Sequence, residues 1–506
     1  MDALLLNLLI FLPLAAAVLI WALPQQQESQ AGRIALLVGF FAAAVGLLLW
    51  AKVDATNLVG VTDTVWFSAG EKSADADGSV TQLSGIQIRY HVGIDAISAP
   101  LLALTALLIP IGVACSFTAV QQRRREYYAW LMFLTGAMFG VFAARDVLLF
   151  YVFFEFTLVP MYFLIGIWGG AERRRAANMF FLYTFVGSVI TFAGILYLAF
   201  RAAQLTASQI VSFDLQILST LSGLTTYEQS LLFLAMFCGF AIKVPFFPLH
   251  TWLPLAHTEA PTAGSVILAG VLLKLGTYGF LRLSLPVVPE GAVIWAQWMG
   301  GLACAGIIYG ALCSWVQNDV KKLVAYSSVS HLGFCMLGMF SLLPVGISGA
   351  VLYMVNHGLS TGALFLIVGM IYERYHTRDM DKVGGLAKRM PIMTFFLIFF
   401  TLASIGLPGL NGFVSEFTTL LAAYNSPVLG PAYGVLGATG ILLGAIYMLY
   451  MAGKLLFGPL KEPPHTPDLS AGLSGDLNTR EIAILTPLAL VCILLGVAPR
   501  IITDTL

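Results

Sequence analysis

Apolar stretches long enough to cross a lipid bilayer follow one another along almost the whole chain. A membrane-spanning helix needs about 20 mainly apolar residues, and the sequence contains fourteen such stretches. Hydrophobic residues make up 59% of the 506 residues and charged residues only 10%, proportions far from those of a soluble domain. The predicted spans are about 4–22, 33–51, 95–119, 128–144, 147–169, 179–200, 229–249, 262–285, 292–315, 320–340, 345–372, 392–423, 432–457 and 481–500.

Charge and cysteine content argue against several classes of protein. The net charge is zero, so no basic surface for nucleic acid is expected. The six cysteines are scattered in apolar runs without a CxxC pair, which argues against an iron–sulfur site or a disulfide framework. No cofactor and no metal are therefore expected in this chain. The first apolar segment lacks a positive n-region, and we interpret it as a retained span.

Basic residues indicate how the chain is oriented in the membrane. Seventeen Lys and Arg residues follow odd-numbered spans and seven follow even-numbered ones, in phase along the whole chain. Because cytoplasmic loops are enriched in Lys and Arg, both termini are predicted on the outer, periplasmic side. Two lysines belong to neither set because they lie inside apolar segments; they are Lys243 and Lys274.

Two of the spans are interrupted, and the interruptions are five spans apart. Pro245 and Pro248 break the seventh span, and the run from Gly406 to Gly412 breaks the twelfth. Since five is odd, a repeated five-helix unit would be inverted in the membrane, and paired broken helices point to an ion path. We predict an all-α polytopic membrane protein with two inverted five-helix repeats. The predicted parts are 1–126 with an outer loop at 52–94, repeats at 127–285 and 286–457, and a linker with a final helix at 458–506.

Ionisable residues inside the apolar spans are the candidate functional residues. A charge at the bilayer centre costs about 2.5–3.5 kcal/mol, so such residues are usually paired, hydrated or functional. Histidine titrates near neutral pH and can relay a proton through both ring nitrogens. We interpret the set as stations of a proton path; its members are Glu155, Lys243, Lys274, His331, His357, Glu416 and His250.

Other polar residues are ranked lower. Asp95 and Asp146 stand at the starts of spans and are expected to cap helices or lie at the interface. His257 and Glu259 are expected near a surface or a cavity mouth. A simpler interpretation also stays open, in which the buried charges only lock helices together and the chain is a structural scaffold.

Several long motifs resemble one known family. They are KVPFFPLHTWLPLAHTEAPTAGS at 243–265, VAYSSVSHLGF at 324–334, GLPGLNGFVSEF at 406–417 and YHTRDM at 375–380. The first three are similar to the signatures of the proton-translocating membrane subunits of NADH:quinone oxidoreductase, or respiratory complex I. The fourth, with the stretch around Glu155, resembles the subunit M or chain 4 type within this antiporter-like family. The resemblance covers essentially the whole chain.

The resemblance implies fourteen helices in two inverted repeats, each with a broken helix. It also implies roles: Glu155 matches the essential carboxylate of the fifth span, Lys243 the lysine of the first broken helix, and Lys274 the connecting lysine. Glu416 matches the terminal carboxylate, and the two histidines at 331 and 357 match the central polar axis. Leu255 stands where bacterial members often have an acid.

The resemblance further implies a setting in the bacterial inner membrane, among other membrane-arm subunits. NADH, FMN, iron–sulfur clusters and quinone are expected in partner subunits, whose redox chemistry would drive the protons. A subunit of a multi-subunit cation/proton antiporter, or of a membrane-bound hydrogenase-type complex, remains an alternative because those complexes share the motifs.

Overall fold

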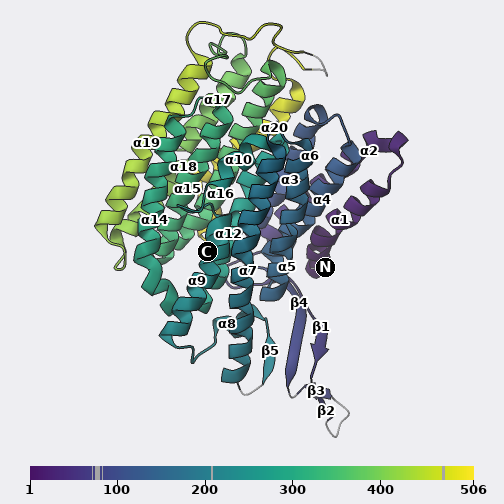
Figure 1. The fold of residues 1–506 in the computed structure, drawn as a ribbon, viewed down its shortest axis with the longest axis vertical. Helices are drawn as coiled ribbons and strands as arrows, with labels where there is room; N and C mark the ends of the chain where they lie inside the picture. The colour runs from purple at the N-terminus through teal and green to yellow at the C-terminus, as the bar shows by residue number, and fades with distance from the viewer. Residues whose placement is uncertain (71, 75–79, 83, 207–208, 470–472) are drawn as a thin grey trace.

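The computed structural model describes residues 1–506 except 71, 75–79, 83, 207–208 and 470–472, so parts of the predicted outer loop and of the predicted linker lie outside the described residues. The chain forms a long bundle of roughly parallel helices with strands at one end (Figure 1). The first helices are α1 (Asp2–Ala22), η1 (Gln25–Gln27), α2 (Glu28–Trp50), α3 (Ser98–Ala119), α4 (Arg124–Ala143), α5 (Val147–Phe156), α6 (Leu158–Trp168) and α7 (Arg173–Leu205).

The middle of the chain contains the first interruption and a span with two π-helical turns. Its elements are α8 (Leu215–Ser219), α9 (Thr226–Lys243), α10 (Trp252–Glu259), α11 (Thr262–Ile267), η2 (Leu268–Leu272), α12 (Leu273–Gly279), η3 (Phe280–Ser284), α13 (Leu285–Val287) and α14 (Pro289–Trp315). The remaining helices are α15 (Val320–Phe340), α16 (Pro344–Tyr375), α17 (Pro391–Ser404), α18 (Asn411–Asn425), α19 (Pro431–Leu456), α20 (Thr479–Val497) and α21 (Arg500–Thr503).

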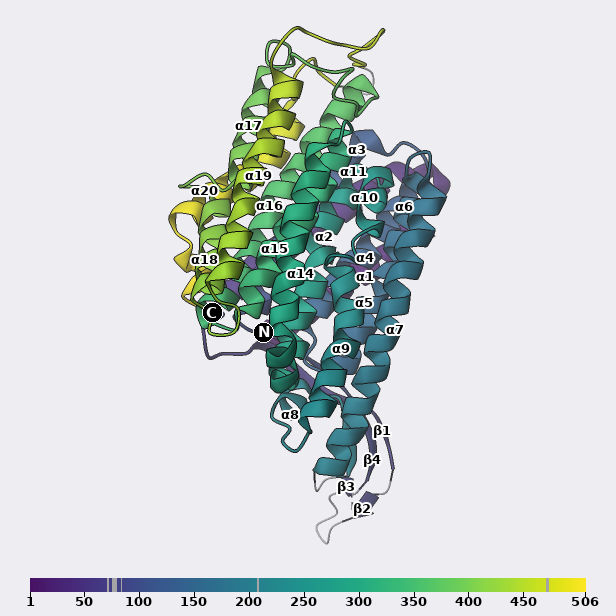
Figure 2. The same ribbon diagram turned by 60° about the vertical axis from the view of Figure 1, so that its left-hand side comes forward.

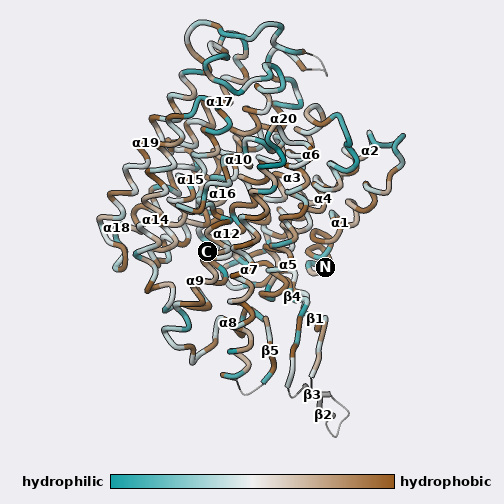
Figure 3. The backbone as a smooth tube through the Cα atoms, viewed as in Figure 1, coloured by the Kyte–Doolittle hydropathy of each residue, from teal (hydrophilic) through white to brown (hydrophobic). Residues whose placement is uncertain are grey.

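Helix length and hydropathy agree with a polytopic membrane protein. Within the described residues, eleven helices are long and apolar enough to span a bilayer. The other three predicted spans fall on α4 and on the two interrupted pairs, α9–α10 and α17–α18. Apolar character dominates along the helices, whereas hydrophilic colour gathers in the loops at the end opposite the strands (Figure 3). The prediction of a helical, multi-pass membrane fold is confirmed, and the count of fourteen spans stays a prediction.

Burial separates central helices from peripheral ones. The span at Thr262–Val287 and α16 are completely buried over their most apolar windows, whereas α7 is only 39% buried. Figure 2 shows α7 along one edge of the bundle and α17 and α19 toward the opposite edge. The exposed side of α7 carries Leu182 and Val186, which suit a lipid or protein neighbour. Ionisable residues on the central helices are therefore shielded by several layers of protein.

A small sheet is the main departure from an all-α chain. The sequence predicts only an outer loop at 52–94, because this segment is polar and lies between apolar spans. Alternation of β-branched and polar residues favours strands there. Strands β1 and β4 are antiparallel, β4 pairs in parallel with β5, and a second antiparallel pair is β2–β3. The strands are β1 (Val59–Ala69), β2 (Lys72–Ala74), β3 (Val80–Gln82), β4 (Gly85–Ile94) and β5 (Ile210–Ser212).

We name the two ends of the bundle by their contents: the strand end carries β1–β5, and the basic end carries the loops at 120–125, 169–175 and 376–390. The N-terminus lies at the strand end, since Lys52 pairs with Asp2 at 2.6 Å and Asn7 donates to Thr62 Oγ1. Helix α20 starts at the basic end, where Glu481 receives two hydrogen bonds from Arg374, and leads away from it. The segment after α19 lies along the basic end, where Asp476 accepts from the backbone N–H groups of Ile392 and Met393.

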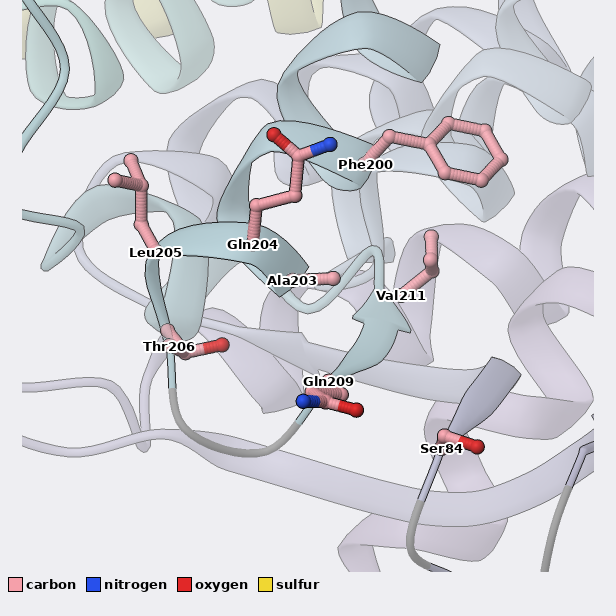
Figure 4. A pocket seen from close by; sticks show the side chains of 8 residues that line it. All are labelled: Ser84, Phe200, Ala203, Gln204, Leu205, Thr206, Gln209 and Val211. Atoms are coloured by element: carbon pink, nitrogen blue, oxygen red, sulfur yellow. The ribbon is translucent and has the colours of Figure 1, made fainter.

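One cavity lies away from the ionisable residues. It is open, has a volume of about 700 Å³, and sits where α7 meets β5 at the strand end (Figure 4). Among the described residues no charged side chain lines it, so we do not regard it as the candidate site. Its lining residues are Ser84, Phe200, Ala203, Gln204, Leu205, Thr206, Gln209 and Val211.

Asp146 caps α5 at the strand end, as predicted. Its Oδ1 accepts from Leu149 N at 2.9 Å, but Oδ2 is buried with no partner within the described residues. Burial raises the pKa of Asp146 to about 6, although the backbone hydrogen bond from Leu149 acts to lower it. The folded chain therefore binds this proton more tightly than the unfolded chain, and the stability linked to it is lost as pH rises from about 4 to 6.

Asp146→Asn keeps a good helix cap but removes the titrating carboxyl group. We predict that, as the pH rises from 4 to 7, the free energy of unfolding of this variant increases by ~2 kcal/mol relative to that of the unsubstituted chain. Melting of the purified chain in mild detergent at both pH values measures this. Asp54→Asn is the contrasting control, because a backbone hydrogen bond from Thr56 lowers the pKa of the exposed Asp54, so its effect has the opposite sign. If the stability of Asp146→Asn and that of the unsubstituted chain changed equally with pH, the raised pKa of Asp146 would be contradicted.

Candidate functional site

The first half of the site surrounds the end of α9. Helix α9 ends at Lys243 because Pro245 and Pro248 cannot continue its hydrogen bonding. The carbonyl of Ile242, left free by the break, accepts from Trp252 Nε1 at 2.9 Å. The buried ammonium of Lys243 lies at the negative end of the half-helix, where a cation is favoured.

Lys243 is held by a hydroxyl group and aromatic rings. Its Nζ donates to Thr157 Oγ1 at 3.1 Å and lies 4.9 Å from the ring centroid of Phe154. Glu155 is two residues before Thr157, half-buried on α5, and its Oε1 has no hydrogen-bond partner among the described residues. Within the part of the chain that is described, no ion pair within 4.0 Å joins Glu155 and Lys243. In this structure the carboxylate and the lysine are therefore not in direct contact.

Lys274 forms the centre of the site, on the helix that follows α10. The π-helical turn η2 comes just before it, and Leu273 N donates to Leu268 O. Lys274 Nζ donates to the carbonyl of Ala269 and lies 2.6 Å from His357 Nδ1 on α16. Sequence periodicity gave no sign of this π-turn, a type of irregularity that is frequent at functional sites.

Glycines allow the close helix approach that brings these side chains together. A Cβ on Gly358 would lie 2.9 Å from the Gly270 carbonyl, and a Cβ on Gly276 would lie 2.7 Å from the Phe240 carbonyl. The first contact presses η2 against α16 beside the pair formed by Lys274 and His357. The second presses α12 against the last turn of α9, which carries Lys243.

A continuous polar run leads from His357 to the second interruption. The rings of His357 and His331 have centroids 5.8 Å apart. His331 Nδ1 is 2.9 Å from the hydroxyl of Tyr353, and that hydroxyl donates to Glu416 Oε1 at 2.9 Å. A hydroxyl has one proton, so His331 carries its proton on Nδ1. Its Nε2 then accepts from Ser404 Oγ at 3.2 Å.

The second interruption holds Glu416 in place. Gly406 has φ +75°, a conformation that favours glycine, and a Cβ there would collide with Glu416 Oε2 in its present position. Asn356 Nδ2 donates to Asn411 O at 2.6 Å and to Ser415 Oγ at 3.0 Å. This clamp connects α16 to the first turn of α18 next to His357.

Most predicted residues are brought together, and two positions need comment. His250 is buried, with its ring on Phe247 and Tyr309. Within the described residues it has no contact with the run from Lys274 to Glu416. His257 was expected near a surface or a cavity mouth. The surface position is wrong, because His257 is 0% exposed and its ring stacks on Phe365 with centroids 4.5 Å apart.

Helix α10 points into the bundle, which explains the burial of His257. Every residue of α10 except Leu255 is buried. Glu259, also expected near a surface or a cavity mouth, is 8% exposed and accepts from the backbone N–H of the exposed Glu172 at 2.8 Å, so its position next to the surface agrees with the prediction. Among the described residues no group of three or more His, Cys, Asp or Glu could hold a metal ion. The expectation of a chain without metal or cofactor stays a prediction.

Tyr353 is the main residue that sequence reasoning missed. It precedes His357 by four positions, so both lie on one face of α16, and that spacing was the available signal.

We predict that Tyr353→Phe lowers proton transfer by about tenfold with assembly intact, since breaking a buried hydrogen bond costs ~1–3 kcal/mol. Proton flux in vesicles measures this.

Tyr447→Phe is the matched control for Tyr353→Phe. The hydroxyl of Tyr447 is 3.4 Å from His331 Nε2 and lies outside the link between His331 and Glu416. Equal flux in the Tyr353→Phe variant and the unsubstituted chain would rule out the hydroxyl bridge.

Fold and site together define a class: a polytopic membrane protein with two broken helices and a buried file of ionisable side chains between them. Residues 144–432 match the family model described as "NADH:quinone oxidoreductase/Mrp antiporter, TM". NADH-quinone oxidoreductase subunit M of Rhodobacter capsulatus is 41% identical over 99% of this chain and 94% of its own. NADH-ubiquinone oxidoreductase chain 4 of Marchantia polymorpha is 39% identical over 98% and 94%. The chain belongs to the subunit M/chain 4 family.

Solved structures agree with this assignment. A chain of respiratory complex I from Thermus thermophilus matches with a TM-score of 0.82 and 29% identity, over 99% of this chain and 98% of that one. A chain of the Mrp complex from Dietzia also has a TM-score of 0.82, over 99% and 96%, but only 19% identity. The second likeness concerns the fold alone.

Proposed function

We propose that this chain carries protons across a bacterial inner membrane as a membrane-arm subunit of an NADH:quinone oxidoreductase. The observation that carries the proposal is the buried run from Lys274 to Glu416. Hydrogen-bond distances join Lys274 to His357, and His331 through Tyr353 to Glu416, while the two histidine rings have centroids 5.8 Å apart. Hydrocarbon does not conduct protons, so a path needs such stations with water or hydroxyl groups between them.

Proton uptake takes place at the first interruption. Lys243 is buried, which favours its neutral form, while the nearby Glu155 favours its charged form. A change in the position or protonation of Glu155 therefore loads or unloads Lys243. The direct hydrogen bond to Thr157 leaves the lysine without a fixed carboxylate partner, so its charge can change without breaking an ion pair.

Transfer through the centre uses the contact between Lys274 and His357. At 2.6 Å the proton can be on either nitrogen, and both rotation of Lys274 and the open Nε2 of His357 allow onward transfer. Nε2 of His357 is buried with no partner among the described residues, and an unpaired buried polar atom is the type of group that binds internal water. One water between the two histidines completes the link.

Release takes place at Glu416, which hands the proton toward the outer side. Moving one charge against 100 mV requires about 2.3 kcal/mol, which redox chemistry in partner subunits would supply. NADH, FMN, iron–sulfur clusters and quinone belong to those partners in this proposal.

The proposal also has the strand end and both termini on the periplasmic side of the membrane. Labelling either terminus with a membrane-impermeant reagent tests this orientation.

A subunit of a gradient-driven cation/proton antiporter remains the second candidate. The observation in its favour is the fold, which this chain shares with a chain of the Mrp complex. The relatives above 35% identity over nearly the whole chain are named as NADH:quinone oxidoreductase subunits, which favours the redox-driven setting. Mass spectrometry of the native complex separates the two: co-purification with only small antiporter subunits would contradict our proposal.

We predict that Glu155→Gln abolishes proton transfer through this chain while the complex still assembles, because a neutral amide cannot shift the charge of Lys243. Redox-driven proton uptake into vesicles containing the whole complex measures this. Glu172→Gln is the control, since Glu172 is exposed and, among the described residues, its carboxylate forms an ion pair only with Arg175 on the surface. Unchanged pumping in the Glu155→Gln variant would overturn the proposed function.

A further inference from the structure

Three charged side chains meet at the strand end of the first half of the bundle. Asp95, between β4 and α3, pairs with Arg282 at 2.5 Å and with Arg145 at 2.9 Å. Arg282 belongs to η3 and is 9% exposed, while Arg145 stands between α4 and α5. Two guanidinium groups therefore share one carboxylate, and the cluster carries a net positive charge.

This cluster lies in line with the central lysine. Lys274, Tyr278 and Arg282 follow one another at intervals of four on one helix, so they lie near one face of it. Arg282 Nε donates to the hydroxyl of Tyr278 at 3.1 Å, and that hydroxyl donates to Phe142 O at 3.2 Å. Along this face, Lys274 is followed by an aromatic ring and then by a cation.

Aromatic rings surround Tyr278, which stands between Lys274 and Arg282 along the helix. The ring of Tyr278 is fully buried, with centroids 5.3 Å from Phe142 and 6.2 Å from Phe150. Phe240 in turn packs against Phe150. By contrast, the way from Lys274 toward Glu416 is lined with histidine and hydroxyl groups.

We propose that Arg282, Asp95 and Arg145 form an electrostatic barrier that closes the strand end of the first half to protons, so that a proton on Lys274 passes sideways to His357. The inference rests on the proposed function and adds to it the reason for lateral transfer. Arginine stays charged at every relevant pH. A proton approaching it in a low-dielectric site meets like-charge repulsion, which is how arginines exclude protons from some pores.

Asp95 does not relay protons through this barrier. Burial acts to raise its pKa, but the charges and hydrogen bonds of Arg282 and Arg145 outweigh burial and hold the pKa of Asp95 well below its usual range. The carboxylate stays ionised and keeps the two guanidinium groups fixed across the end of the helix. The same contacts also join α3 and η3, so a purely structural role has to be separated by experiment.

The test is passive proton flux into vesicles that contain the whole resting complex, under an imposed membrane potential. Arg282→Met removes the charge but keeps a long side chain, and leaves Asp95 paired with Arg145. We expect the flux to rise about tenfold, the change for a barrier lowered by ~1.4 kcal/mol. Arg282→Lys keeps the charge and should stay as tight as the unsubstituted complex.

A second substitution shows where the protons flow. In the Arg282→Met, Lys274→Met double variant the flux should return to its original level, because the central station is missing. Three results would each overturn the barrier. The first is vesicles with Arg282→Met that stay tight, and the second is a leak in Arg282→Lys as large as that in Arg282→Met. The third is a leak in the double variant that persists without Lys274. If Arg282→Met prevents assembly, Arg145→Met decides by the same criteria, since Asp95 then keeps Arg282.

The outcome is separable from that of the proposed function. Redox-driven pumping with Glu155→Gln, measured in the same vesicles, tests whether the chain carries protons at all. Lost pumping in that variant together with tight Arg282→Met vesicles would remove the barrier and leave the proposed function standing.

Discussion

The contact between Lys274 and His357 is the interaction on which the rest of the site depends. A lysine that is 0% exposed in the middle of a bundle must find acceptors inside the protein. It finds one in the Ala269 carbonyl of a π-helical turn and one in the histidine of the facing helix. The glycines let η2 approach α16 closely enough for this contact, and the clamp by which Asn356 holds α18 fixes the second interruption beside it.

The two broken helices perform complementary tasks. The first places a cation, Lys243, at the negative end of a half-helix, and the second places an acid, Glu416, against a glycine with a positive φ. Between them the central span carries the buried Lys274. The division of the chain into inverted repeats at 127–285 and 286–457 remains a prediction, supported by the matching positions of the two breaks.

Much of this arrangement could be predicted from the sequence, because the membrane imposes strong rules. Apolar length located the spans, proline and glycine located both breaks, and buried charges pointed to Lys243, Lys274 and Glu416. The roles of the candidate residues stay predictions. The sequence did not predict the sheet, the π-turns or the bridging hydroxyl of Tyr353, because they depend on contacts between distant segments. The burial of His257 was not predicted for the same reason, since it depends on the direction that α10 takes in the bundle.

The central claim is that protons pass from the first half of the chain to the second through Lys274. The most direct measurement is the number of protons pumped per NADH oxidised by the reconstituted complex, with Lys274→Met compared with the unsubstituted chain at equal electron-transfer rates. Our account predicts a lower ratio, because the contribution of this chain is lost. An unchanged ratio in a fully assembled complex would show that the protons take a route that bypasses Lys274.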